Sequence, residues 1–158
     1  MATSLDLTVL GSGSGGNAAV IRFGDQALLV DAGFSAAELQ RRCDAAGIDT
    51  TTPRGLIITH EHDDHVQAAR VFCKRNTLTA YANTLTAERL HQLHKAPADI
   101  AAFANGSPFV IGPFKIEAFS ISHDAVDPVA LTIHCDGRKI GIATDRLQGT
   151  QQILGMQQ

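Results

Sequence analysis

The sequence feature that most constrains this 158-residue chain is the segment His60–His65, with the sequence HEHDDH. Three of the seven histidines and three carboxylates fall within it, directly after a short apolar run typical of a buried strand. Residues i and i+2 leaving a strand project to the same side, so His60 and His62 can bind one metal ion. A helical turn after them would place Asp64 and His65 beside a second ion. These donors suit Zn²⁺, Mn²⁺ or Fe²⁺, so the segment predicts a metal site rather than a solvated acidic loop.

Three further polar residues stand at the ends of expected strands. His123 follows the strand expected at 114–121, and Asp145 ends the segment 141–145. Because strand ends can converge at one sheet edge, both are candidates to complete the ligand set. Asp31 ends an earlier strand. It either caps the next segment or supplies a carboxylate that orients the metal-binding histidines.

A glycine-rich loop, Gly11–Gly16, matches the G-x-G-x-x-G pattern of dinucleotide-binding proteins. That pattern requires a helix directly after the loop, whose N-terminus receives the pyrophosphate. Residues 17–31 instead have the pattern of two strands, which disfavours dinucleotide binding. A flexible turn and an active-site loop stay open as interpretations; in the second case Ser12, Ser14 and Asn17 are the candidate substrate-loop residues.

The rest of the chain alternates strand-like runs, turn signals and helical stretches. Ser35 and Glu38 have the spacing of a capping box, and Gly47 is placed to end that helix. The expected strands are 5–10, 17–23, 26–31, 55–59, 79–82, 109–111, 114–121, 129–135 and 139–144, and the expected helices are 35–47, 65–74 and 84–94. This pattern predicts one α/β (α+β) domain over residues 1–158, with much antiparallel sheet.

Composition excludes several classes of protein. The chain is 44% apolar and 18% charged, which argues against disorder. Its longest apolar runs are far shorter than the ~20 residues of a membrane span. No basic N-terminal segment leads into an apolar stretch, so we expect neither a signal peptide nor membrane association.

The three cysteines form no CxxC pair, which predicts reduced thiols and a cytoplasmic protein; they are Cys43, Cys73 and Cys135. With a net charge of −3, a polyanionic substrate would need a local attraction.

These residues together resemble the metallo-β-lactamase fold superfamily. The matching positions are His60, His62, Asp64 and His65 for its HxHxDH motif, Asp31 for the preceding strand-end Asp, His123 for the third motif and Asp145 for the bridging Asp. Within that superfamily, the glycine-rich loop, together with His123-Asp124-Ala125 and Pro128-Val129, is similar to the WalJ/YycJ group.

The resemblance implies a metallo-β-lactamase-like αββα sandwich and a cytoplasmic bacterial phosphodiesterase that acts as a DNA exonuclease. It implies two divalent ions, Zn²⁺ or Mn²⁺. By this resemblance His60, His62 and His123 bind one ion and Asp145 bridges the pair. Asp64 and His65 bind the other ion and are the candidate catalytic residues.

The chain departs from the superfamily pattern after Asp145. Such proteins continue with a second αβ half that carries a last metal-binding histidine, whereas here no histidine follows His134 and the sequence ends at Gln158. We therefore expect only the N-terminal half of the sandwich plus part of the second sheet. An apolar sheet face left uncovered would favour self-association.

Three functional hypotheses follow. The first is a metal-dependent hydrolase, specifically a phosphodiesterase or exonuclease acting on DNA through a hydroxide held by two metals. The second keeps the fold and changes the substrate to small esters, thioesters or lactones, because one metal site serves many reactions. The third is a non-catalytic, truncated remnant that binds one metal for stability or only pairs with another chain.

Overall fold

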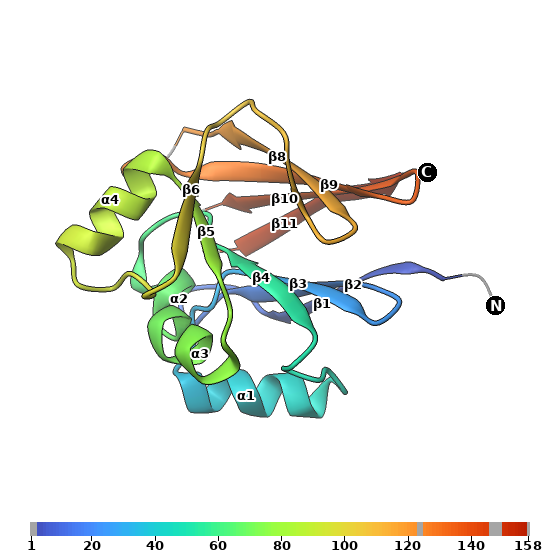
Figure 1. Cartoon of the computed structure of the whole chain (residues 1–158), viewed down its shortest axis with the longest axis horizontal. Helices are drawn as coiled ribbons and strands as arrows, with labels where there is room; N and C mark the ends of the chain where they lie inside the picture. Colours follow the sequence, from blue (N-terminus) through green and yellow to red (C-terminus); the bar gives the residue numbers. More distant parts are fainter. Residues whose placement is uncertain (1–2, 123–124, 146–149, 158) are drawn as a thin grey trace.

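Two β-sheets packed face to face form the centre of the computed structural model (Figure 1), which describes residues 3–122, 125–145 and 150–157. For residues 144, 145 and 150–157 it describes the backbone only. Helices lie on the outer side of one sheet, so the described residues form helical, sheet and sheet layers in that order.

The first sheet has six strands in sequence order. They are β1 (Leu5–Gly11), β2 (Ala18–Phe23), β3 (Gln26–Val30), β4 (Pro53–Ile57), β5 (Ala80–Asn83) and β6 (Ile100–Phe103). The first three pair antiparallel, whereas β3 to β6 pair parallel. Parallel neighbours need crossover connections, which here contain the helices. The carboxyl ends of the parallel strands consequently meet at one edge of the sheet, next to α2 (Figure 1).

The described residues form four helices, α1 (Ala36–Ala45), α2 (Asp63–Val66), α3 (Ala69–Asn76) and α4 (Thr84–Gln92). Ser35 caps α1 as expected, since its hydroxyl accepts the Glu38 N–H at 3.2 Å. The carboxylate of Glu38 binds Arg41 and Arg42 instead of closing the capping box. Asn83 caps α4 through the Thr86 N–H, also with a side-chain oxygen.

The second sheet is antiparallel throughout. Its order is β11 (Thr150–Gln157), β10 (Arg138–Asp145), β9 (Val129–Cys135), β8 (Phe114–Ser120) and β7 (Phe109–Ile111). The turn between β9 and β10 is Asp136-Gly137, with φ of +52° and +74°. Two successive positive φ values match the twist of a tight hairpin, which is why Asp-Gly suits this position.

Two apolar layers hold the sheets and helices together. One lies between the helices and the six-stranded sheet and includes Leu29, Leu56 and Phe72. The other lies between the two sheets and includes Leu28 and Phe114. Neighbouring residues of β3 thus enter different layers, because successive side chains of a strand point to opposite faces. Complete burial of each such side chain stabilises the fold by roughly 1.5–3 kcal/mol.

No helix among the described residues covers the outer face of the five-stranded sheet (Figure 1). Val110 and Phe119 are 69% and 44% exposed, on β7 and β8 respectively. Self-association through this face stays a prediction.

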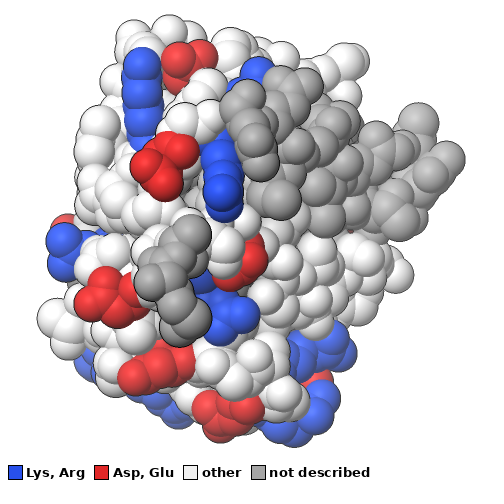
Figure 2. Space-filling model, turned by 90° about the vertical axis from the view of Figure 1, so that its right-hand side faces the viewer, with Lys and Arg blue, Asp and Glu red and all other residues white. Residues whose placement is uncertain are grey.

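Charges of both signs are mixed at one end of the sheets. Figure 2 looks onto the end that carries the β2–β3 and β9–β10 turns, where Lys and Arg are interspersed with Asp and Glu.

Most expected elements are present, with small differences in their ends. The predicted helix 65–74 is divided into α2 and α3, and two strands, β6 and β11, were not expected. Short runs such as Ile100–Phe103 carry little periodicity, and their partner strands come from distant sequence. Within the described part of the chain, no helix is long and apolar enough to cross a membrane.

All three cysteines are free and buried, as expected for small core residues. Burial raises the pKa of Cys43 to about 11, of Cys73 to about 12, and that of Cys135 above its usual value.

Because the thiolate is the reactive form, we expect no labelling of these three buried thiols by iodoacetamide at pH 8 in the folded protein. Mass spectrometry should detect three labels after denaturation in urea; rapid labelling of the folded protein would contradict the buried placement.

Candidate metal centre

The candidate site forms where β3 and β4 end side by side. Asp31 directly follows β3, and its N–H donates to the Ile57 carbonyl at the end of β4 at 2.8 Å. Asp31 is fully buried and has a left-handed φ of +60°, a conformation that Asp tolerates better than most residues. The HxHxDH segment begins at His60, three residues after β4 ends. Chain topology therefore brings both sequence motifs to one edge.

The Asp31 carboxylate receives three hydrogen bonds. One oxygen accepts the Thr59 N–H at 2.8 Å. The other accepts the Thr59 hydroxyl at 2.7 Å and contacts Nδ1 of His65 at 2.7 Å. A buried carboxylate is costly unless its oxygens are paired, and here the donors compensate that cost.

This network determines which nitrogen of two imidazoles carries a proton. The single hydroxyl hydrogen of Thr59 goes to Asp31, so the Thr59 oxygen accepts from Nδ1 of His60, 3.0 Å away. Nδ1 of His65 likewise donates to the carboxylate. In the neutral form of each ring the lone pair then lies on Nε2, the form required of a metal ligand. Asp31 thus orients one predicted ligand directly and another through Thr59.

His60, Asp64 and His65 present potential ligand atoms that all lie within 4.8 Å of one another. Nε2 of His65 is 3.8 Å from the Asp64 carboxylate, and the rings of His60 and His65 have centroids 3.9 Å apart. The His62 ring meets that of His60 edge-on at 4.9 Å. Two imidazoles and a carboxylate this close fit a divalent cation, with ligand bonds of about 2.0–2.2 Å.

The glycine-rich loop is bound to the motif by Asn17. Its side-chain amide donates to the carbonyls of Gly13 at 2.8 Å and Asp64 at 3.0 Å, and its oxygen accepts the Gly13 N–H. Asn17 is fully buried, whereas Ser12 and Ser14 are exposed. The structure thus gives Asn17 a role in holding the loop, and substrate contact by the three residues stays a prediction.

The loop glycines are explained by packing. The φ of Gly16 is +146°, and a Cβ there would lie 2.4 Å from the Phe34 ring. Strand β2 follows the loop, so no helix N-terminus is available for a dinucleotide, as expected. Gly33 is still more confined, because a Cβ would lie 1.7 Å from the Asp64 carbonyl oxygen.

Glu61 was not assigned a role by sequence reasoning. It is only 6% exposed, and its carboxylate accepts the Val126 N–H at 3.0 Å. The contact ties the HxHxDH segment to the connection between β8 and β9. The only signal for this role in the sequence is the position of a carboxylate within a segment that follows a buried strand.

Two predicted ligands are not placed by the structure. His123 lies outside the described residues, and Asp145 is described only by its backbone at the end of β10.

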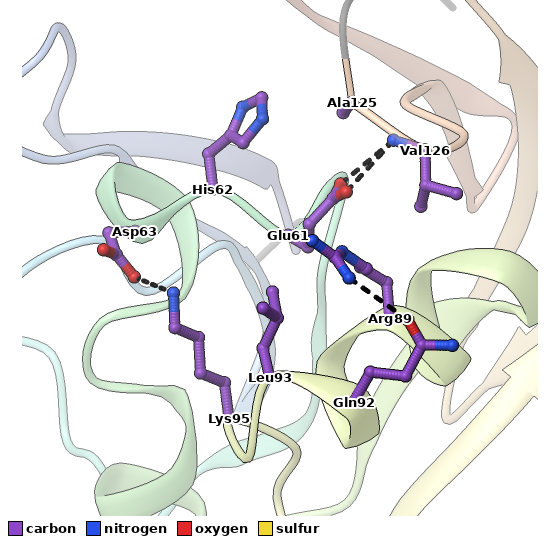
Figure 3. A pocket seen from close by; sticks show the side chains of 9 residues that line it. All are labelled: Glu61, His62, Asp63, Arg89, Gln92, Leu93, Lys95, Ala125 and Val126. Carbon is purple, nitrogen blue, oxygen red and sulfur yellow. Dashed lines mark hydrogen bonds and ion pairs between the residues drawn. The ribbon is translucent and has the colours of Figure 1, made fainter.

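A pocket of about 630 Å³ adjoins the motif (Figure 3). Its walls include His62 and Asp63 on one side and Arg89 and Lys95, from α4 and the residues after it, on the other. Lys95 forms an ion pair with Asp63, and Arg89 donates to Gln92 at 3.2 Å. Sequence reasoning missed both cations, because nothing in the sequence shows that α4 ends beside the motif.

Comparisons with known proteins agree with this geometry. The Metallo-beta-lactamase superfamily profile matches residues 11–143. Exodeoxyribonuclease YycJ of Bacillus anthracis is 33% identical, over 89% of this chain and 54% of that protein. Exodeoxyribonuclease WalJ of Streptococcus pneumoniae is 29% identical, over 87% and 53% respectively. Ribonuclease J of Helicobacter pylori is 29% identical, over 75% of this chain and 19% of that protein. The chain thus spans about half the length of the first two of these relatives.

Solved structures show the same fold. The metallo-beta-lactamase fold protein YhfI from Bacillus subtilis aligns with a TM-score of 0.71 at 21% identity, covering 87% of this chain and 60% of that one. A B3 metallo-beta-lactamase with an active-site glutamic acid aligns with a TM-score of 0.74 at 18% identity, covering 88% and 59%. The expected αββα-type architecture, present in part, is confirmed.

The Asp31 network predicts the effect of Asp31→Asn. An amide retains one acceptor oxygen but adds an NH₂ group toward Thr59 or His65, which breaks the orienting contacts. We expect affinity for Zn²⁺ to fall by about 10- to 100-fold in calorimetric titration. Asp25→Asn, in the exposed β2–β3 turn, is the matched control. Unchanged affinity in Asp31→Asn with an intact circular dichroism spectrum would refute the orienting role.

The confinement of Gly33 predicts a loss of stability in Gly33→Ala. The added methyl group must displace the Asp64 carbonyl, and overpacking of this kind costs typically about 1–3 kcal/mol. Urea unfolding measures the difference. Gly15→Ala is the control, because a Cβ there meets nothing within 4 Å and the φ of Gly15 is not positive. Equal midpoints for the two variants would show that the contact with Asp64 relaxes without cost.

Proposed function

Because the chain belongs to the metallo-beta-lactamase superfamily, we propose that it provides the metal-binding part of a phosphodiesterase that cleaves nucleic acid, with DNA as its substrate. The proposal takes its substrate class from the exodeoxyribonuclease and ribonuclease J relatives. The proposed metal chemistry is inferred from the residues of the candidate metal centre.

One observation carries the proposal: a buried carboxylate orients two imidazoles beside a third potential ligand. The residues fit divalent cations, since Nδ1 of His60 and of His65 contacts the Asp31–Thr59 network and Asp64 adds a carboxylate. Their ligand atoms lie within 4.8 Å of one another, a spacing that suits the ligands of one ion or of two neighbouring ions. The proposed holders of one ion are His60, His62 and His123. Those of a second are Asp64 and His65, with Asp145 shared between the two ions. When bound, Zn²⁺ or Mn²⁺ supplies an activated water at neutral pH and offsets the charge of a phosphate.

The chain's own residues contribute rigidity. His60 and His65 are 1% and 2% exposed, so their rings lose little freedom when they bind an ion. Asn17 fixes the peptide of Asp64, and Glu61 holds the β8–β9 connection against the motif. Ligands held in place by protein contacts are organised before the reaction, which lowers the cost of reaching the reactive geometry.

The setting proposed for this activity is the cytoplasm. Cys43, Cys73 and Cys135 are unpaired thiols, which are typical of a reducing compartment. With a net charge of −3 the chain offers no strong overall attraction to a polyanion, so bound cations would supply the local positive charge.

The proposal predicts metal-dependent cleavage of 5′-labelled DNA that His62→Ala abolishes. The ligand is lost, but His62 is only half-buried, so the core is retained. EDTA should stop the reaction, and Mn²⁺ or Zn²⁺ should restore it, as followed on denaturing gels. His134→Ala, on β9, is the control and should keep full activity. Hydrolysis of small esters or lactones without DNA cleavage would refute the nuclease assignment in favour of a different hydrolase.

A further inference from the structure

The pocket beside the motif is the first of three hollows that lie next to one another and share lining residues. The second, of about 510 Å³, shares Asp63 and Lys95 with the first. The third, of about 420 Å³, shares Arg70 with the second and continues to Lys74. This row of hollows extends from beside His62, past the residues after α4, to α3. We name it the α3–α4 trough.

Four cationic side chains line the trough. Arg89 and Lys95 lie in the hollow beside the motif, Arg70 lines the second and third hollows, and Lys74 lines the third. Arg70 and Lys74 are both exposed, and their i, i+4 spacing on α3 places them on one face of the helix, about 5–6 Å apart at Cβ. Within the described residues neither forms an ion pair.

The carboxylates of the trough already have partners. Glu61 accepts the Val126 N–H, Asp63 pairs with Lys95, and Asp99 accepts the Thr79 hydroxyl. At the far end Arg70 donates to the His94 carbonyl at 3.4 Å, which uses one of its five N–H donors. Neither Arg70 nor Lys74 is ion-paired with a described carboxylate, so both can bind an external anion. Among the described lining residues there is no Phe, Tyr or Trp on which a base could stack. The cations of the trough thus offer contacts to phosphates.

We propose that the α3–α4 trough holds the backbone of one nucleic-acid strand, whose phosphates contact Arg70 and Lys74 while its end reaches the pocket beside His62. This inference rests on the proposed nuclease function and adds the path of the substrate. Contacts to phosphates carry no sequence information, so binding is independent of sequence and sensitive to salt.

The test compares two double variants of the full chain that remove the same charge. Arg70→Ala/Lys74→Ala removes the far end of the trough. Arg75→Ala/Lys115→Ala is the control, because Arg75 is exposed on the same helix outside the trough lining and Lys115 is exposed on β8. Fluorescence anisotropy with a labelled single-stranded oligonucleotide in EDTA measures affinity without cleavage, at several salt concentrations.

The trough variant should bind several-fold more weakly than the control. The slope of log K against log salt should become shallower by about 0.7 for each phosphate that the variant no longer binds. In the cleavage assay KM for the oligonucleotide should rise, while hydrolysis of bis(p-nitrophenyl) phosphate, which is too small to reach Arg70, should not change. Equal binding by the two double variants overturns the proposal. So does an equal loss on the small substrate, which would show damage to the site.

The two proposals fail separately. If Arg70→Ala/Lys74→Ala selectively weakens oligonucleotide binding but no preparation cleaves DNA, the trough stands and the nuclease function falls. If cleavage depends on His62 but neither affinity nor salt dependence responds to Arg70 and Lys74, the function stands and the trough falls. Circular dichroism confirms that each variant is folded before either result is read.

Discussion

The buried carboxylate of Asp31 is the interaction on which the rest of the site depends. Asp31 occupies a left-handed conformation at the end of β3, and the surrounding contacts are what hold it there. Its two oxygens are shared between Thr59 and His65. One side chain thus joins the strand ends and sets the orientation of two imidazoles, and through Thr59 it also sets the proton position on His60.

Around Asp31, the metal-binding segment is held in place mainly by contacts to its backbone and less by long side chains. The peptide of Asp64 is held by Asn17 on one side and by the close approach of Gly33 on the other. The Ala32 N–H donates to the His65 carbonyl, which joins α2 to the segment after β3. These contacts connect three sequence regions that share no local pattern, and together they leave the motif little freedom to move.

The sequence predicted the features that depend on local patterns. The strands with clear alternation and the Ser35 cap are visible in short windows, and the HxHxDH spacing indicates metal chemistry by itself. Glu61, Arg89 and Lys95 could not be assigned, because their roles depend on contacts with residues distant in the sequence. β6 was not predicted, since a four-residue apolar run is shaped by its parallel neighbour. The ligand roles of His123 and Asp145 stay predictions of the resemblance.

Both faces of β3 are buried, and this affects how the register of β3 against β4 is specified. Leu28 and Leu29 are both buried, one in each apolar layer, so shifting the strand by one residue would exchange one apolar face for another. Hydrophobic alternation, which normally penalises such slippage, discriminates weakly here. The polar contacts of Asp31 with Ile57 and Thr59 can form only when Val30 lies opposite Ile57. The Asp31 carboxylate that orients the metal-site histidines therefore also favours the native register of β3 against β4.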